Sequence, residues 1–148
     1  MDQRSIEHGV SVARTAAEVF SHLSEADKLE RWFPAEAKTD PVQGGHYRFG
    51  FKRTDGSLDH ERSGTFLLVE PGKRLAYDWD FGQGKTRVEF VLSSNGGQTA
   101  VRLQHSGFAQ GPAWEEAFRM HEAGWKMYLG NLKSVLEQGQ DQRAAMFG

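Results

Sequence analysis

The C-terminal part of the chain carries one long apolar stripe, which limits the possible folds more than any other feature of the sequence. From Ala113 to about Glu137, apolar residues and one histidine recur every three or four positions, as on one face of a helix. Pro112 suits the first turn of this helix, and Gly139 suits the position just past its end. Such a helix, roughly 25 residues and about 37 Å long, needs a broad apolar surface to lie across. The stripe consists of Trp114, Ala117, Phe118, His121, Trp125, Tyr128, Leu129, Leu132, Val135 and Leu136.

The composition limits the kinds of partner. The chain has 148 residues, enough for a single domain over residues 1–148, and its net charge of −2 favours neither nucleic acid nor an anionic membrane as a partner. It has no cysteine, which excludes disulfides, thiolate catalysis and cysteine-bound metals. The first seven residues are polar, and apolar residues never run together for about 18 positions. We therefore expect a soluble, cytoplasmic protein without membrane insertion.

Three short elements are predicted at the N-terminal end. Residues from Ile6 to Val12 alternate between apolar and polar, which indicates a half-buried strand. Thr15 and Glu18 have the spacing of a capping box and predict a short helix behind them. Ser24 and Asp27 repeat that signal for a second short helix, which carries Leu29, Trp32 and Phe33 before Pro34 ends it.

From Ala35 to Phe108 the pattern has a period of two residues and is interrupted at regular intervals by glycine-rich turns, which predicts an antiparallel meander. One stretch departs from the alternation, because Phe66 to Val69 is apolar throughout; either both faces are covered there or a bulge shifts the register. The predicted fold class is α+β, with helices on one face of an antiparallel sheet of about six or seven strands. The tail from Gln140 to Gly148 is expected to fray.

The order of these elements resembles the START-related helix-grip superfamily, also called SRPBCC. The motifs resemble its branch named after the C-terminal domain of the activator of Hsp90 ATPase homologue. The resemblance covers nearly the whole chain, in the expected order. The matching stretches are Val12 to Phe33, Val42 to Phe49, Gly64 to Trp79, Thr86 to Phe90, His105 to Phe108, and Gly124 to Leu132.

The resemblance implies a curved sheet that grips the long helix, with a cavity between them that holds a hydrophobic small molecule in related proteins. Activators of Hsp90 have an additional N-terminal domain, whereas this chain begins directly with its first strand, so Hsp90 is not expected as a partner. A homodimer is possible. No cofactor is implied.

The candidate cavity-lining residues are the aromatic and histidine residues on the inner sides of the predicted sheet and helix. They are Trp32, Phe49, Phe51, Tyr77, Trp79, Phe90, His105, Phe118, His121, Trp125 and Tyr128. The same rings would also serve as an ordinary packed core, and the sequence does not separate the two roles. Gly124 weakens the helix, and close approach to the sheet would explain its presence.

Two histidines have alternative interpretations. His121 is either held by a local hydrogen bond in the core or points a polar group into the cavity. His105 should point inward at the end of the last strand, where it more often fixes the turn into the long helix than lines a site. No HExxH or similar spacing indicates a metal, and no nucleophile elbow or phosphate-binding loop is present. Asp59 and Glu61 share a strand face that is interpreted as solvated rather than catalytic.

Three hypotheses for the function follow. The first is a binding module that encloses an apolar or aromatic small molecule between sheet and helix and has no assigned reaction. The second is an enzyme of the cyclase or aromatase type, in which a cavity histidine acts as general acid or base. The third is a protein-interaction domain, comparable with the Hsp90 co-chaperones. We assign no catalytic residue.

Overall fold

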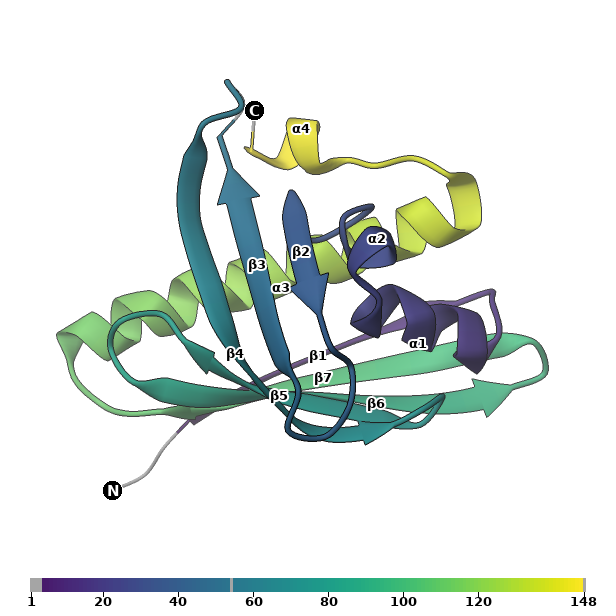
Figure 1. The fold of residues 1–148 in the computed structure, drawn as a ribbon, viewed down its shortest axis with the longest axis horizontal. Helices are drawn as coiled ribbons and strands as arrows, with labels where there is room; N and C mark the ends of the chain where they lie inside the picture. The colour runs from purple at the N-terminus through teal and green to yellow at the C-terminus, as the bar shows by residue number, and fades with distance from the viewer. Residues whose placement is uncertain (1–3, 54, 148) are drawn as a thin grey trace.

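Seven antiparallel strands form one curved sheet, in the spatial order β1-β7-β6-β5-β4-β3-β2 (Figure 1). The computed structural model describes residues 4–53 and 55–147. A pair of short helices follows β1, the meander follows the pair, and the long helix α3 comes after β7. The elements are β1 Arg4–Val12, α1 Ala16–Ser24, α2 Ala26–Leu29, β2 Glu36–Thr39, β3 His46–Lys52, β4 Leu58–Glu70, β5 Arg74–Asp80, β6 Lys85–Asn95, β7 Gln98–Phe108, α3 Pro112–Gln138 and α4 Arg143–Phe147. This is the predicted α+β helix-grip architecture.

Helix α3 lies on the inner side of the sheet and runs beside β1 (Figure 1). Its side chains cover the free edge of that strand: Lys133 Nζ donates to the Ser11 carbonyl at 2.5 Å, and the Ala13 amide donates to Glu137 Oε2 at 2.8 Å. These two bonds lie at the C-terminal end of β1, where they satisfy backbone groups of an edge strand. The helix starts at Pro112 and ends before Gly139, which adopts φ +68°, so the predicted boundaries are confirmed.

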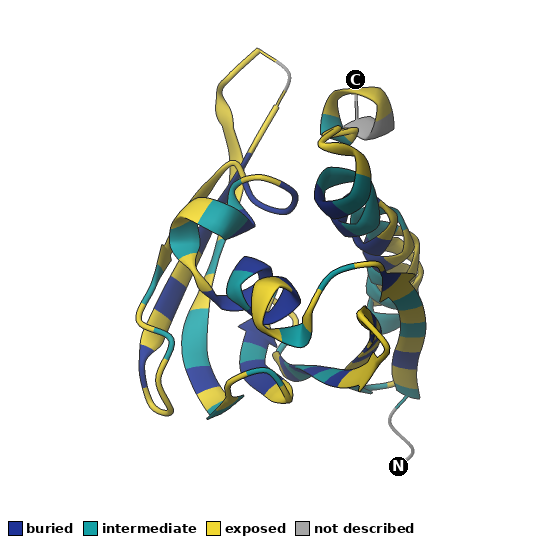
Figure 2. Ribbon diagram, turned by 90° about the vertical axis from the view of Figure 1, so that its right-hand side faces the viewer, coloured by how far each residue is buried: buried dark blue, intermediate teal, exposed yellow. Residues whose placement is uncertain are grey.

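Strands β3 and β4 continue beyond the rest of the sheet. The pairing of β4 with β5 ends at Phe66 and Tyr77, and the next backbone amide, from Thr65, donates to the Asp78 carboxylate at 2.9 Å. We call the strand pair beyond that point the arm; it comprises residues 46–52 and 58–65. The arm turns away from β5, β6 and β7 and stands opposite α3 (Figures 1 and 2).

The stretch from Phe66 to Val69 contains a bulge. The register of β4 against β5 shifts between Phe66 and Leu68, which leaves Leu67 outside the pairing and 39% exposed. Of the two explanations that the sequence left open, the bulge is therefore the correct one.

The second short helix differs from its prediction. The Ser24 hydroxyl does not cap α2: Glu25 is the N-cap residue, no side chain makes a cap bond there, and Ser24 Oγ donates to the Phe20 carbonyl of α1 at 2.9 Å. Helix α2 ends at Leu29, so Trp32 and Phe33 lie in the turns that follow rather than on a helix. The Thr15 cap is confirmed by its bond from the Glu18 amide at 3.2 Å.

The tail after Gly139 is held in place, contrary to the expectation that it frays. Arg143 donates to the Glu30 carbonyl at 2.7 Å and to the Pro34 carbonyl at 2.8 Å, and the Gln142 amide donates to Asn131 Oδ1 at 2.7 Å. These bonds place α4 beside the turn between α2 and β2, while Gly148 lies outside the described residues. Among the described helices, none is long and apolar enough to cross a membrane.

Candidate functional site

The predicted lining residues form one layer of rings between the sheet and α3. Phe118, His121 and Tyr128 are partly buried and the others are buried. The layer is continuous between its two walls, the sheet and α3. Trp79 of β5 packs against Trp125 of α3 with ring centroids 6.1 Å apart, and Phe33, in the turn after α2, packs against Tyr128 at 4.8 Å. Phe118 lies apart from the others, at the far end of the layer against Phe108, with the Arg4 guanidinium 4.1 Å from its ring centroid.

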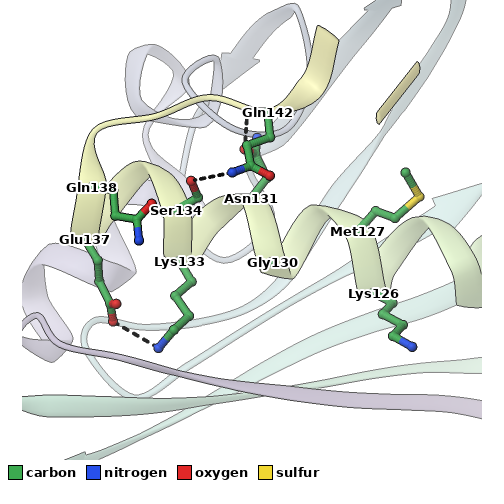
Figure 3. A pocket seen from close by; sticks show the side chains of 9 residues that line it. All are labelled: Lys126, Met127, Gly130, Asn131, Lys133, Ser134, Glu137, Gln138 and Gln142. Carbon is green, nitrogen blue, oxygen red and sulfur yellow. Dashed lines mark hydrogen bonds and ion pairs between the residues drawn. The ribbon is translucent and has the colours of Figure 1, made fainter. Parts of the chain in front are cut away.

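None of these residues lines either of the two pockets that stand out on the protein. One pocket, of about 510 Å³, lies on the outward side of α3 near its C-terminal end, between Met127, Ser134 and Gln142 (Figure 3). The other, of about 460 Å³, lies on the sheet beside Ser5 and Lys85. The rings between sheet and helix pack against one another instead, so the layer has the form of a closed core.

His105 links two strands and the helix. It is fully buried, and Trp125 Nε1 donates to its Nδ1 at 2.9 Å, so the ring carries its proton on Nε2. That N–H faces the Thr86 hydroxyl at 2.6 Å, and the hydroxyl in turn donates to the Trp79 carbonyl at 2.8 Å. Burial, reinforced by the nearby His121, lowers the pKa of His105 to about 3. The ring is therefore neutral and locked, and it does not fix the turn as the sequence indicated.

His121 is held in a similar way at the edge of the layer. Trp79 Nε1 donates to its Nε2 at 3.2 Å, so Nδ1 carries the proton and donates to the Ala117 carbonyl at 2.7 Å. Burial lowers the pKa of His121; the bond to the Ala117 carbonyl opposes this shift, and the positive charge of Arg62 adds to it. Both ring nitrogens of both histidines are thus engaged. In this conformation neither histidine offers a nitrogen to a substrate.

The two walls meet along a line that we call the seam. It is formed by residues of the arm and of α3: Phe51, His60, Arg62, His121, Gly124 and Tyr128. His60 lies directly opposite Phe51 on the neighbouring strand, and Arg62 lies opposite the fully buried Phe49, so both side chains share the inner face of the sheet. The rings of Phe51 and His60 stack at 4.7 Å.

Gly124 leaves an open place in the seam. It follows His121 by three residues and precedes Tyr128 by four, so all three share one face of α3. A Cβ atom added at Gly124 would meet nothing within 4 Å. The expected close approach of this glycine to the sheet is therefore wrong, and the helix has unfilled space beside it.

Arg62 is one of three seam residues, with His60 and Gly124, that the sequence interpretation did not place among the lining residues. Its Nε is buried and has no hydrogen-bond partner, and its one hydrogen bond among the described residues runs from Nη1 to the Glu61 carbonyl at 2.9 Å. Burial lowers the pKa of Arg62, because desolvation disfavours the charged form. Counting back in steps of two from the inward Phe66 would have placed Arg62 on the inner face.

The carboxylates near this strand are engaged elsewhere. Asp59 pairs with Arg53 at 3.0 Å and with His60 at 2.7 Å, while Glu61 accepts from Arg48 Nε at 3.0 Å on the outer face. Asp59 and Glu61 are exposed, as the sequence indicated. Within residues 4–53 and 55–147, there is no cluster of three or more His, Asp or Glu side chains that could hold a metal ion.

Comparison with known proteins identifies the type of domain. The family model described as "Activator of Hsp90 ATPase homolog 1-like protein" matches residues 13–137. The chain resembles the solution structure of the Aha1 dimer from Colwellia psychrerythraea, with 20% identity, a TM-score of 0.80, and coverage of 93% of this chain and 98% of that chain. No curated protein matches it.

Two further solved structures are similar. CalU16 from Micromonospora echinospora is 28% identical, with a TM-score of 0.73 over 93% of this chain and 78% of that one. DynU16, a protein of the dynemicin biosynthetic locus, is 23% identical, with a TM-score of 0.76 over 94% of this chain and 49% of that one. This fold and family fit a ligand-binding domain in general. Because the family model spans most of the chain, the protein belongs to the family of activator of Hsp90 ATPase homolog 1-like proteins.

Proposed function

We propose that this protein binds an aromatic or otherwise apolar small molecule between the curved sheet and α3, and that the molecule enters through the seam. The observation that carries the proposal is the open place at Gly124, where a side chain would meet nothing although the ring layer begins immediately beside it. A glycine inside a helix costs about 1 kcal/mol relative to alanine, so the helix gives up stability at this place.

The construction of the seam supports this proposal. The arm and α3 are joined across it by ring contacts, such as Phe51 to Tyr128 at 6.4 Å, whereas α3 is hydrogen-bonded to β1 on its other side. Rings at a surface change rotamer without disturbing backbone hydrogen bonds. Because small-molecule sites usually enclose roughly 300 Å³ or more, Phe51 and Tyr128 would have to move aside for the ligand. The deeper rings, Phe49, Tyr77 and Phe90, would form the floor.

The comparisons also support a bound small molecule. One structural neighbour, DynU16, comes from a biosynthetic locus, and both CalU16 and DynU16 share the sheet-and-helix arrangement. A cyclase-type reaction at a histidine is not part of the proposal, because the nitrogens of His105 and His121 are engaged by Trp125, Thr86, Trp79 and Ala117.

A matched pair of variants tests this proposal. The probe is the neutral N-phenyl-1-naphthylamine, whose fluorescence rises in apolar surroundings and which can accept energy from the tryptophans of the ring layer. We expect the wild-type protein to bind it, and Gly124→Phe, which fills the open place, to weaken binding by about tenfold or more, equivalent to about 1.4 kcal/mol.

The control is Gly130→Phe on the outward side of the same helix, where an added Cβ also meets nothing within 4 Å. This variant should bind the probe as the wild type does. If the wild-type protein does not bind the probe, or if the two variants weaken binding equally, the proposed site is wrong.

The assembly state is a separate proposal. The relative from Colwellia psychrerythraea is a dimer, and we propose by analogy that two copies of this chain associate. Sedimentation velocity across micromolar concentrations measures this directly. A single monomeric species throughout that range would contradict it.

A further inference from the structure

We infer that the small molecule carries an anionic group, such as a carboxylate, phenolate or sulfonate, which pairs with the Arg62 guanidinium at the seam. This inference rests on the proposed function and deepens it, because it names the chemical class of the ligand as an aromatic or apolar anion.

The position of Arg62 is the first argument. Its side chain shares the inner face of the arm with Phe49 and His60, and its charge is felt by His121 on the opposite wall. Arg62 therefore faces the ring layer from the arm. Arg48 pairs with Ser63 and lies between the buried Tyr47 and Phe49, so it points to the outer face, where it bonds Glu61. A ligand lying on the rings would have its polar end beside Arg62.

The second argument is that Arg62 lacks a directly paired carboxylate among the described residues. In the described part of the chain, the neighbouring arginines each have a carboxylate: Arg48 of the arm pairs with Glu61, and Arg53, just beyond the end of β3, pairs with Asp59 at 3.0 Å. Arg62 has no carboxylate within 4.0 Å among the described residues, and its buried Nε has no acceptor. Asp59 and Asp80 favour its charged form only from a greater distance. A charged group taken partly out of water without a partner is unfavourable, and an anionic ligand would remove that penalty.

The chemistry of the guanidinium selects the ligand group. Arginine presents five N–H donors in a plane and no acceptor, which matches the two oxygens of a carboxylate or the oxygens of a sulfonate. A neutral carbonyl would satisfy one donor but would not supply a directly paired anion. Because the ring layer lowers the local dielectric, the attraction between opposite charges is stronger at this place than at the outer face.

Two fluorescent probes that differ by one group test the inference. 8-Anilinonaphthalene-1-sulfonate has the ring system of N-phenyl-1-naphthylamine plus an anionic sulfonate. Both dissociation constants are measured for the wild type, Arg62→Gln and the matched control Arg48→Gln. We expect Arg62→Gln to weaken the sulfonate probe about tenfold or more, as is typical of a lost charged hydrogen bond, and to leave the neutral probe within about twofold. Arg48→Gln should leave both constants unchanged.

The neutral probe separates the two proposals. If the wild type binds neither probe, the proposed function fails and the inference fails with it. If the wild type binds both probes and Arg62→Gln weakens them equally, or if Arg48→Gln weakens the sulfonate probe as much as Arg62→Gln does, the inference is overturned while the proposed function stands. Urea unfolding of each variant shows that the fold is retained during the measurement.

Discussion

The buried His105 makes a definite prediction for the dependence of stability on pH. Its pKa is about 3 in the folded protein, because burial and the nearby His121 disfavour the imidazolium, whereas an unfolded chain restores a pKa near the ordinary histidine value of 6.5. The unfolded state therefore binds a proton that the folded state does not bind between these two values. Stability due to this group is fully present above pH 6.5 and is lost as the pH falls from 6.5 toward 3.

The size of the effect follows from the two pKa values. Each pH unit between them changes the free energy of unfolding by about 1.36 kcal/mol, so lowering the pH from 7 to 5 should remove about 2 kcal/mol through His105 alone. Burial also lowers the pKa values of His22 and His121, so they contribute in the same direction. The measurement is urea denaturation at pH 7, 6 and 5, followed by tryptophan fluorescence.

His105→Phe isolates this contribution. The variant loses stability at pH 7, because Trp125 Nε1 and the Thr86 hydroxyl lose their partner in the core. Its stability should nevertheless fall by about 2 kcal/mol less than that of the wild type between pH 7 and 5, since His22 and His121 remain in both proteins. If the two proteins lost the same free energy over this range, the assignment of a neutral, buried His105 would be refuted.

Three further changes test separate parts of the structure, each by urea denaturation. Gly124→Ala should stabilise the protein by about 0.8–1 kcal/mol, because the added Cβ meets nothing within 4 Å and alanine is the better helix former; a loss of stability would show that the place is filled. Trp125→Ala should destabilise by about 3–5 kcal/mol, because this side chain is 3% exposed and packs in the ring layer. Arg143→Ala should cost about 1–3 kcal/mol through its bonds to the Glu30 and Pro34 carbonyls, whereas the exposed Arg31→Ala should change little; equal effects would mean that the tail does not hold the α2 turn.

The features predicted correctly from the sequence are local ones. The period of three to four residues located α3, and Pro112 and Gly139 located its ends, because a helix is specified by spacing along its own chain. The alternation and the glycine turns likewise located the strands of the meander. These signals need no knowledge of what packs against them.

The features that were missed depend on partners far away in the chain. Arg143 holds the tail by bonding carbonyls more than a hundred positions earlier, and no local pattern signals such a contact. Ser24 has the residue type of a cap, but it is the last residue of α1, where its hydroxyl donates back to the Phe20 carbonyl, and Glu25 takes the N-cap position of α2. The hydrogen bond between Trp79 and His121 likewise joins the sheet to α3, and no pattern in the sequence indicates which side chains meet there.

The predicted site residues divide by depth in a way that has consequences for function. His105 and Trp125 satisfy each other's ring nitrogens deep in the layer, so moving either one would break a buried hydrogen bond. At the seam, Gly124 contributes no side chain, and the buried Nε of Arg62 has no acceptor among the described residues. A ligand bound there would add contacts to these two residues without breaking a contact that they already make. If a ligand binds between sheet and helix, its energetically favourable place is therefore the seam, with the deep rings acting as a fixed floor.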